Sequence, residues 1–356
     1  MSTKEIRVAF TGIGNCTSHV IQGLYYYKDI SDNSKHISGL MHPVLGEYKI
    51  FDIKPVAAFD IDRNKVGKDL SEAIFTKPNN CTFFAKVPNL GVKVNMGPIL
   101  DGAPDHLRQF VNVYDEMKPS DVVKILKDSG AEIFVNFIPT GSAKAARFYA
   151  DCALEAGCGY INCMPELIAS DEAYQKKFKD KTLPIIGDDV KSQVGATILH
   201  RALVDLCEKR GVKINKTSQL NFAGNTDFVN LVKRGETKEM TKATSVRSVL
   251  SNKDAEVSVG FGYIGLQKDN KICRLYIEGE NFGGNPITIL CECSIEDSAN
   301  SAGVVIDAIR YMKLAIDRKI SGALIAPSSF LMKHPPVKLS DEQAREDCEK
   351  FIQGGA

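Results

Sequence analysis

The sequence predicts an α/β protein: a Rossmann-like parallel sheet domain, split in sequence, with an inserted α+β domain that carries a mainly antiparallel sheet. Three observations predict this class. Short apolar runs alternate with helical patterns near both ends of the chain, and a glycine-rich turn follows the first run. After Gly211, alternation of apolar and polar residues replaces this pattern. We therefore expect one domain to comprise residues 1–198 and 299–356, and the inserted domain to comprise residues 199–298.

The chain opens with a strand, a tight turn and a helix. Residues 6–11 are apolar and β-branched, Gly12-Ile13-Gly14 follows at once, and apolar residues then recur at helical spacing from Cys16 to Tyr27. In a dinucleotide-binding unit the first glycine permits the turn and the second lets the backbone approach a pyrophosphate. Thr17 stands where the G-x-G-x-x-G pattern has its third glycine, so the flanking strand and helix carry the prediction.

A second strand, residues 55–60, ends in Asp60, a carboxylate suited to accept ribose hydrogen bonds and to disfavour a 2′-phosphate. The polar insertion at residues 28–48 separates Asp60 from the glycines by more than the usual ~20 residues. We therefore predict NAD rather than NADP as cofactor. The alternative is a Rossmann-like turn that binds nothing.

The alternation of strands and helices continues through the first domain. Residues 78–104 are rich in Pro, Gly and Asn and are expected to form a long loop, either a lid or an oligomer contact. Ser120 is expected to cap a helix. The remaining expected helices and strands are 120–128, 133–138, 143–156, 160–163 and 183–186, then the alternating strands 216–223, 257–263, 271–279 and 286–295, and helices at 300–318 and from about Ser340.

Composition excludes several classes of function. Lys and Arg number 45 against 44 Asp and Glu, so the net charge of +1 gives no bulk attraction to nucleic acid or to anionic lipid. No apolar run reaches the ~18 residues of a membrane span, and the N-terminus is typical of a strand rather than a signal peptide. The ten cysteines then indicate reduced thiols in the cytoplasm, and their spacing assigns no metal ligands.

Two regions carry chemistry without a recognised nucleophile motif. Lys238 and Lys242 lie four apart in a basic stretch, so on a helix they share a face. Two adjacent ammonium groups depress each other's pKa, which would supply a neutral base beside a cation; the alternative is a solvated helix face. Residues 187–192 follow a strand, where parallel sheets bind ligands, although their acids also suit a helix N-terminus.

Several segments together resemble the inositol-1-phosphate synthase family, in its short bacterial and archaeal form. The resemblance rests on VAFTGIGNCTSHVIQGLYYY, VAAFDIDRNKVGKDL, NFIPTGSAKAARFYADCALEAG, PIIGDDVKSQVGATILHRAL, QLNFAGNTDFVNL, EDSANSAGVVIDAIRYMKLAIDRKISG and PSSFLMKHPP. It implies isomerisation of D-glucose 6-phosphate to 1L-myo-inositol 1-phosphate, for inositol and phospholipid biosynthesis. It also implies tightly bound, regenerated NAD, a homotetramer, and an activating cation whose identity the sequence leaves open.

The resemblance also implies roles for individual residues. The catalytic set is Lys238, Lys242, Lys271, Lys333 and Asp297, and the substrate-binding set is Lys191, Ser192, Asn225 and Asp227. With the glycine turn, the cofactor-binding set becomes Gly12, Gly14, Asn15, Cys16, Asp60, Asn136, Pro139, Thr140, Asp188 and Asp189. Longer members carry SGQT as a phosphate cradle, whereas this chain reads Ser192-Gln193-Val194-Gly195, the form that the short branch shares.

The implied reaction oxidises C5, forms an enolate, closes the ring by an aldol step from C6 to C1, and reduces the ring ketone. We expect Lys333 or Lys238 to act at C5, Lys271 to polarise the C1 oxygen, Lys242 to hold phosphate, and Asp297 to orient a lysine or relay a proton. Three alternatives stay open: a sugar-phosphate dehydrogenase with net redox change, a related carbocycle-forming synthase on another sugar phosphate, and a dinucleotide sensor without catalysis.

Overall fold

The computed structural model describes residues 4–33, 36–234 and 236–355, without the side chains of Thr237, Lys238 and Thr241. Its larger sheet has the strand order β13-β8-β7-β6-β1-β4-β5, and all its neighbouring strands run parallel. Its strands are β1 (Ile6–Thr11), β4 (Ile53–Asp60), β5 (Val94–Met96), β6 (Ile133–Asn136), β7 (Gly159–Asn162), β8 (Pro184–Ile186) and β13 (Gly322–Ala323).

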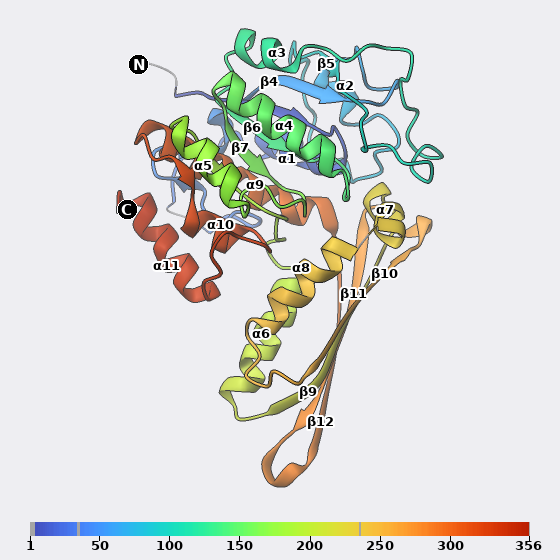
Figure 1. Ribbon diagram of the computed structural model, residues 1–356, viewed down its shortest axis with the longest axis vertical. Helices are drawn as coiled ribbons and strands as arrows, with labels where there is room; N and C mark the ends of the chain where they lie inside the picture. The colour runs from blue at the N-terminus through green and yellow to red at the C-terminus, as the bar shows by residue number, and fades with distance from the viewer. Residues whose placement is uncertain (1–3, 34–35, 235, 356) are drawn as a thin grey trace.

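Helices cover both faces of this sheet, as expected for a buried parallel sheet. On one face α1 (Asn15–Tyr26) packs against the long helix α9 (Asp297–Asp317), and together they build the largest apolar core. The other face carries α3 (Val122–Asp128), α4 (Ala143–Ala156) and α5 (Glu172–Asp180) (Figure 1). The short helix α2 (Leu70–Ala73), the hairpin β2 (Val44–Leu45) and β3 (Tyr48–Lys49), and the C-terminal helices α10 (Ile325–Leu331) and α11 (Asp341–Ile352) complete this part.

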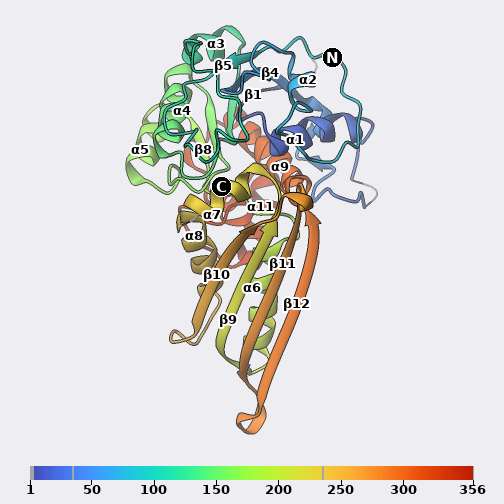
Figure 2. The same cartoon turned by 90° about the vertical axis from the view of Figure 1, so that its right-hand side faces the viewer.

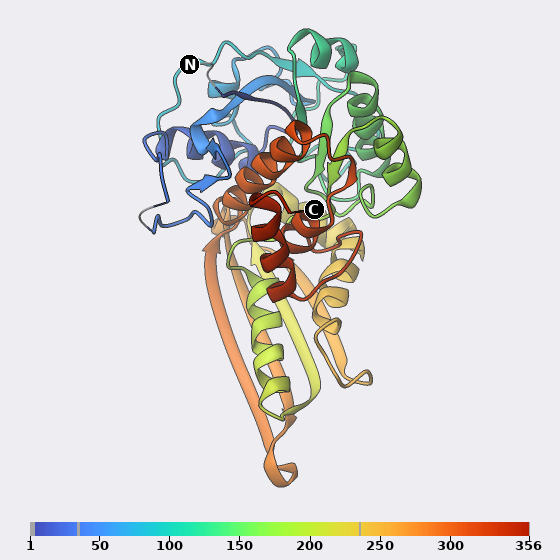
Figure 3. The same ribbon diagram turned by 90° about the vertical axis from the view of Figure 1, so that its left-hand side faces the viewer.

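The second sheet projects away from the first as a long, narrow blade (Figure 2). Its order is β10-β9-β11-β12, with bounds β9 (Lys213–Ala223), β10 (Glu256–Tyr263), β11 (Asn270–Glu280) and β12 (Pro286–Glu296). Helix α6 (Ala196–Lys209) packs on one face of this sheet (Figure 3). Between β9 and β10 the chain forms α7 (Thr226–Arg234) and α8 (Glu236–Arg247).

The predicted fold class is confirmed, with one refinement in the second sheet. β9 pairs antiparallel with β11 and β11 with β12, but β9 and β10 run parallel. The helices α7 and α8 form the crossover that a parallel pair requires, whereas a tight hairpin would have reversed the chain. The apolar–polar alternation shows which face is buried and does not reveal the direction of pairing.

Three local expectations were wrong or incomplete. Helix α3 is capped by Asp121, whose carboxylate accepts from Lys124 N, while the backbone N–H of Ser120 bonds to Met96 O. The loop 78–104 contains the edge strand β5, and the insertion contains the hairpin of β2 and β3. These strands span only two or three residues, too few to produce a periodic pattern.

Two further observations bear on the setting of the protein. Within the described residues, none of the helices is both long enough and apolar enough for a bilayer span. All ten cysteines carry free thiols, as the sequence predicts.

The insertion is fastened to the first sheet's helices through His42. Its Nδ1 lies 2.6 Å from Asp307 Oδ2 and its Nε2 lies 3.0 Å from Glu349 Oε1, which joins α9 and α11. Burial disfavours the charged imidazole, but the two carboxylates outweigh that effect and raise the pKa of His42 above 6.5. The ring is therefore a positively charged cross-link at mildly acidic pH.

We expect His42→Gln to destabilise the protein more at about pH 5.5 than at about pH 8.5. A histidine whose pKa is higher in the folded than in the unfolded state stabilises the fold most at pH values below its unfolded-state pKa. This stabilisation is lost as the pH rises through the folded-state pKa. Thermal unfolding of both proteins at the two pH values measures this, with the exposed His36→Gln variant as control. A difference in Tm that does not change with pH would contradict the charged cross-link.

Candidate active site

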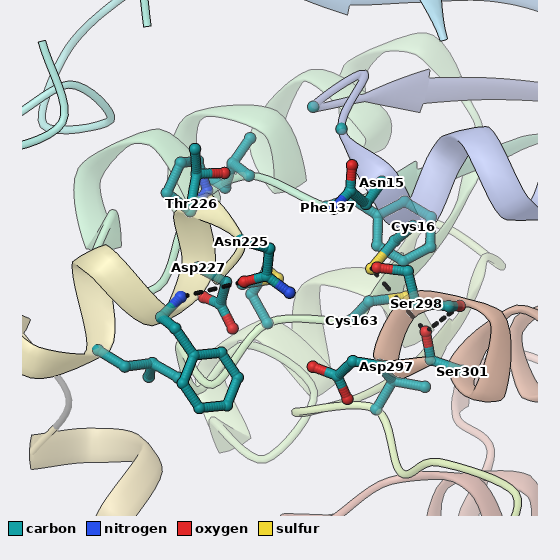
Figure 4. Close-up of a pocket in the computed structure, with 18 of the residues that line it drawn as sticks. Asn15, Cys16, Phe137, Cys163, Asn225, Thr226, Asp227, Asp297, Ser298 and Ser301 are labelled. Atoms are coloured by element: carbon teal, nitrogen blue, oxygen red, sulfur yellow. Dashed lines mark hydrogen bonds between the residues drawn. The ribbon is translucent and has the colours of Figure 1, made fainter. Parts of the chain in front are cut away.

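One large cavity lies at the carboxyl edge of the parallel sheet, where the second sheet joins it (Figure 4). The glycine turn after β1 and the segments after β6, β7 and β8 form one side. Segments from α7, α8, β10 and β11 form the other side, and the start of α9 closes the rear. Ligands bind at this edge in open parallel sheets.

The glycine turn has the shape that a dinucleotide requires. Gly12 has φ of +81°, and a Cβ there would lie 2.5 Å from Phe137 O, so only glycine fits. A Cβ on Gly14 would meet nothing within 4 Å, which leaves room for a phosphate beside the start of α1. Asp60 Oδ2 accepts from Ile13 N at 2.8 Å and also faces the cavity. These residues fit NAD.

Sequence reasoning missed Lys65 at this end of the cavity. Its buried ammonium donates to Ile13 O at 2.8 Å and to Asn79 Oδ1 at 2.9 Å, and it lies 3.9 Å from Asp60 Oδ2. Lys65 therefore links the glycine turn to loop 78–104 through hydrogen bonds, and part of this loop lines the cavity. No motif marks Lys65, because its partners are a backbone carbonyl and an amide from distant segments.

Three of the four predicted catalytic lysines line the same cavity: Lys242, Lys271 and Lys333. The fourth, Lys238, lies in α8, and its side chain is outside the described part of the structure. Lys242 stands over the Phe261 ring, with Nζ 4.8 Å from the ring centroid. Lys271, on β11, forms an ion pair with Asp297 at the start of α9.

Lys333 is held by the loop after β8. Its Nζ donates to Asp189 Oδ1 at 2.9 Å and to Val190 O at 2.6 Å. Asp189 has φ of +62°, a backbone conformation that costs a non-glycine residue of order 1–3 kcal/mol and is common at binding sites. The loop thus orients one carboxylate and one ammonium toward the cavity.

The segment before α7 faces these lysines. Asn225 and Asp227 line the cavity (Figure 4). Thr140 Oγ1, which is outside the lining, donates to Asp227 Oδ1 at 2.9 Å. Asn225 Nδ2 donates to Asp269 Oδ1 at 2.8 Å. Burial, with the nearby charge of Asp297, raises the pKa of Asp269 to about 7.

Cys16 and two serines missed by the motif analysis, Ser298 and Ser301, form the rear wall. The Cys16 thiol lies 3.7 Å from Ser298 Oγ, and burial raises its pKa to about 12. The thiol therefore stays protonated, and it shapes the wall rather than acting as a nucleophile. Figure 4 shows these three side chains opposite Asn225.

Four predicted site residues do not line the cavity: Asn136, Thr140, Asp188 and Lys191. Asp188 is fully buried and accepts hydrogen bonds from Asn162 and from the backbone of residues 168–170; burial raises its pKa to about 6. Lys191 Nζ donates to Ser329 O at 2.8 Å, and burial lowers its pKa to about 8. Asp188 and Lys191 therefore hold the loop after β8 in place through buried hydrogen bonds and do not face the cavity.

The remaining predicted residues line the cavity: Gly12, Gly14, Asn15, Cys16, Asp60, Pro139, Asp189, Ser192, Asn225, Asp227 and Asp297. The N-terminus of α6 also opens into it through Ala196, Thr197 and Ile198. Gly195 caps this helix, and a Cβ there would lie 2.7 Å from the Ser192 side chain. A helix N-terminus of this kind is suited to an anion.

Comparison with known proteins agrees with this architecture. Residues 195–298 match the family model of myo-inositol-1-phosphate synthase. The inositol-3-phosphate synthase of Mycolicibacterium smegmatis is 45% identical over 359 residues, which cover 98% of this chain and 98% of that protein.

Two solved structures share the fold over nearly the whole length. Ari2 is 31% identical with a TM-score of 0.82, and the match covers 98% of this chain and 99% of Ari2. A myo-inositol-1-phosphate synthase-related protein from Thermotoga maritima is 25% identical with a TM-score of 0.80, covering 98% of each chain. Both parts of the molecule are therefore similar to known proteins.

Proposed function

Because the chain belongs to the myo-inositol-1-phosphate synthase family, we propose that it converts D-glucose 6-phosphate to 1L-myo-inositol 1-phosphate, using NAD that stays bound and is regenerated. One observation carries the proposal: the ammonium-bearing side chains of Lys242, Lys271 and Lys333 line the cavity that the glycine turn also lines. A protein that only senses a dinucleotide would have no use for three convergent lysines there.

Bound NAD would accept hydride from C5 of the sugar and return it after ring closure, so net redox is zero. Gly12 and Gly14 would admit its pyrophosphate, and Asp60 would accept hydrogen bonds from its adenosine ribose. Asp60 already orients the turn by accepting from Ile13 N at 2.8 Å. The carboxylate favours NAD over NADP, because a 2′-phosphate would be repelled.

The substrate phosphate would bind where α6 begins. Backbone N–H groups of Ala196 and Thr197 at this N-terminus have no partners within their own helix, and the helix dipole favours an anion there. Lys242 is close enough to α6 to contribute, after burial, to lowering the pKa of His200 to about 4. We therefore assign the phosphate to Lys242, Ser192 and this helix end.

The other two lysines would act on the sugar oxygens. Lys333 is oriented by Asp189, at 2.9 Å, and would accept the C5 hydroxyl proton or stabilise the developing oxyanion. Lys271, paired with Asp297, would polarise the C1 oxygen for attack by C6. Each step develops negative charge on oxygen, and ammonium groups stabilise that charge more in the transition state than in the substrate.

The reaction is tested by incubating the purified protein with glucose 6-phosphate and substoichiometric NAD, followed by phosphorus NMR of the product. We expect inositol 1-phosphate in excess of the NAD added, without accumulation of NADH. NADH formed in proportion to product would identify a dehydrogenase with net redox change. Turnover only with a different sugar phosphate would identify a related carbocycle-forming synthase; either result overturns the proposal.

We also propose that the protein is a homotetramer and works in the cytoplasm, a reducing compartment that suits its ten free thiols. The face of the second sheet opposite α6 supports self-association. It carries Leu220 and Leu290, which are 41% and 77% exposed, and none of the helices in the described residues covers it in Figure 2. Both leucines share this face with Arg274, as the strand register requires.

Replacing both Leu220 and Leu290 by glutamate is expected to reduce the assembly to dimers or monomers. Glutamate side chains that replace the leucines would face one another across the interface, where they would repel and lose hydration on association. Light scattering after size-exclusion chromatography measures the mass. Leu206→Glu, on the exposed side of α6, is the matched control and should keep the wild-type mass. A double variant that stays tetrameric would rule out this face.

A further inference from the structure

Three potential metal ligands meet directly behind the cavity wall. The ligand atoms of His19, Asp269 and Glu296 all lie within 4.8 Å of one another. His19 comes from α1, Asp269 immediately precedes β11, and Glu296 is the last residue of β12. None of the three lines the cavity, so this cluster is separate from the lysine site.

The imidazole of His19 is oriented as a ligand. Its Nδ1 lies 3.1 Å from the carbonyl oxygen of Asn15, which can only accept, so Nδ1 carries the proton. Nε2 therefore has a lone pair, and its neighbour is the Thr82 hydroxyl at 3.3 Å. The ring also stacks on Phe84, with 5.4 Å between centroids. A carbonyl behind Nδ1 and a fixed ring plane are the usual support of a metal-binding histidine.

The two carboxylates bring negative charge to the same place. His19 and Asp269 are 0% exposed, and Asp269 receives its hydrogen bonds from uncharged donors, namely Asn15 Nδ2, Asn225 Nδ2 and the Ser298 backbone and hydroxyl. Glu296 Oε1 accepts from Thr82 N at 3.0 Å. The Lys271 ammonium is engaged by Asp297. A buried carboxylate such as Asp269 either takes up a proton or is compensated by a cation, and a metal ion would supply that cation to both carboxylates.

We propose that His19, Asp269 and Glu296 bind a divalent transition-metal ion, with Zn²⁺ as the first candidate. One neutral imidazole and two carboxylate oxygens form a three-ligand set that Zn²⁺ accepts, leaving a fourth position for water or the Thr82 hydroxyl. Imidazole disfavours Mg²⁺ and Ca²⁺, which prefer oxygen ligands. Binding at this cluster does not depend on the proposed reaction.

The ion would hold parts of the active site together without touching substrate. Asp269 lies two residues before Lys271, Glu296 immediately precedes Asp297, and His19 lies one helical turn after Asn15. A metal bound here would fix the position of the glycine turn relative to the Lys271–Asp297 pair, because each ligand is close in sequence to one of these parts. These three ligands are therefore positioning residues.

Isothermal titration of the chelator-treated, full-length protein with Zn²⁺ tests the proposal. We expect one ion per chain for the wild type, and affinity at least ~100-fold weaker for His19→Gln and for Glu296→Gln, which retains the side-chain size. The exposed His36→Gln variant should bind as the wild type does. Circular dichroism confirms that each variant is folded.

A second readout uses Co²⁺ in place of Zn²⁺, because its visible absorption reports the ligands directly. The wild type should show bands that disappear in His19→Gln while the protein stays folded. Zn²⁺ binding that is unchanged in both ligand variants would assign the ion to other residues, for example the cavity carboxylates, and would overturn the proposal. Absence of binding at millimolar Zn²⁺ would also overturn it.

Discussion

Lys271→Ala and Lys333→Ala are each expected to lower kcat for inositol phosphate formation by ~10²–10³-fold, the effect of removing one oxyanion-stabilising donor. Both ammonium groups line the cavity and are held by carboxylates, Asp297 and Asp189. Their charges are thus oriented before the reaction begins, and little reorganisation is needed when the oxyanion forms. Binding of NAD, whose pyrophosphate we propose to lie at the glycine turn, should change far less than kcat.

The measurement is steady-state turnover with saturating glucose 6-phosphate and NAD, together with titration of NAD binding by fluorescence. Lys176→Ala is the matched control, because its ammonium forms an exposed helix pair with Asp180 far from the cavity. Circular dichroism separates loss of chemistry from loss of fold. Wild-type turnover in both active-site variants would remove these lysines from the mechanism.

Much of the fold follows from residue patterns. β1, β4, β6 and the helices α1 and α4 were predicted within one or two residues, since buried apolar runs and helical spacing mark them directly. The parallel pairing of β9 with β10 was not predicted, because direction depends on the helices that connect the strands. Short strands such as β5 are too short to show a pattern of their own, and they are stabilised by pairing with the neighbouring strand of the sheet.

The candidate site was predictable to the level of segments and less so for single side chains. The loop after β8 was expected at the cavity, and Asp189 and Ser192 do line it. Their neighbours Asp188 and Lys191 point into the protein, where Asp188 accepts from Asn162 and Lys191 donates to Ser329 O. The turn at Asp189, with φ of +62°, breaks any regular alternation in this loop, so the sequence pattern does not show which side chains face the cavity. The cluster around His19 gave no signal, since His19 lies far from Asp269 and Glu296 in the sequence and the three residues match no metal-binding spacing.

Gly12→Ala is expected to weaken NAD binding by at least ~100-fold, equivalent to about 3 kcal/mol. Alanine would require φ near +81° and would bring its Cβ to 2.5 Å from Phe137 O, a backbone atom that cannot swing aside. The turn must therefore open, which moves Ile13 away from Asp60 and disrupts the pyrophosphate position. Fluorescence titration with NADH and the NAD retained after purification measure the effect.

Gly67→Ala is the control that separates the steric clash of a new Cβ from the strain of a left-handed backbone. Gly67 has φ of +91°, yet a Cβ there would meet nothing within 4 Å. Both variants carry the left-handed backbone penalty of roughly 1–2 kcal/mol, so both should lower Tm. Only Gly12→Ala has the additional clash at the cofactor turn, so only that variant should lose NAD. Equal NAD affinity in the two variants would show that the turn tolerates a side chain, and would leave Asp60 and Lys65 as the groups that define the cofactor site.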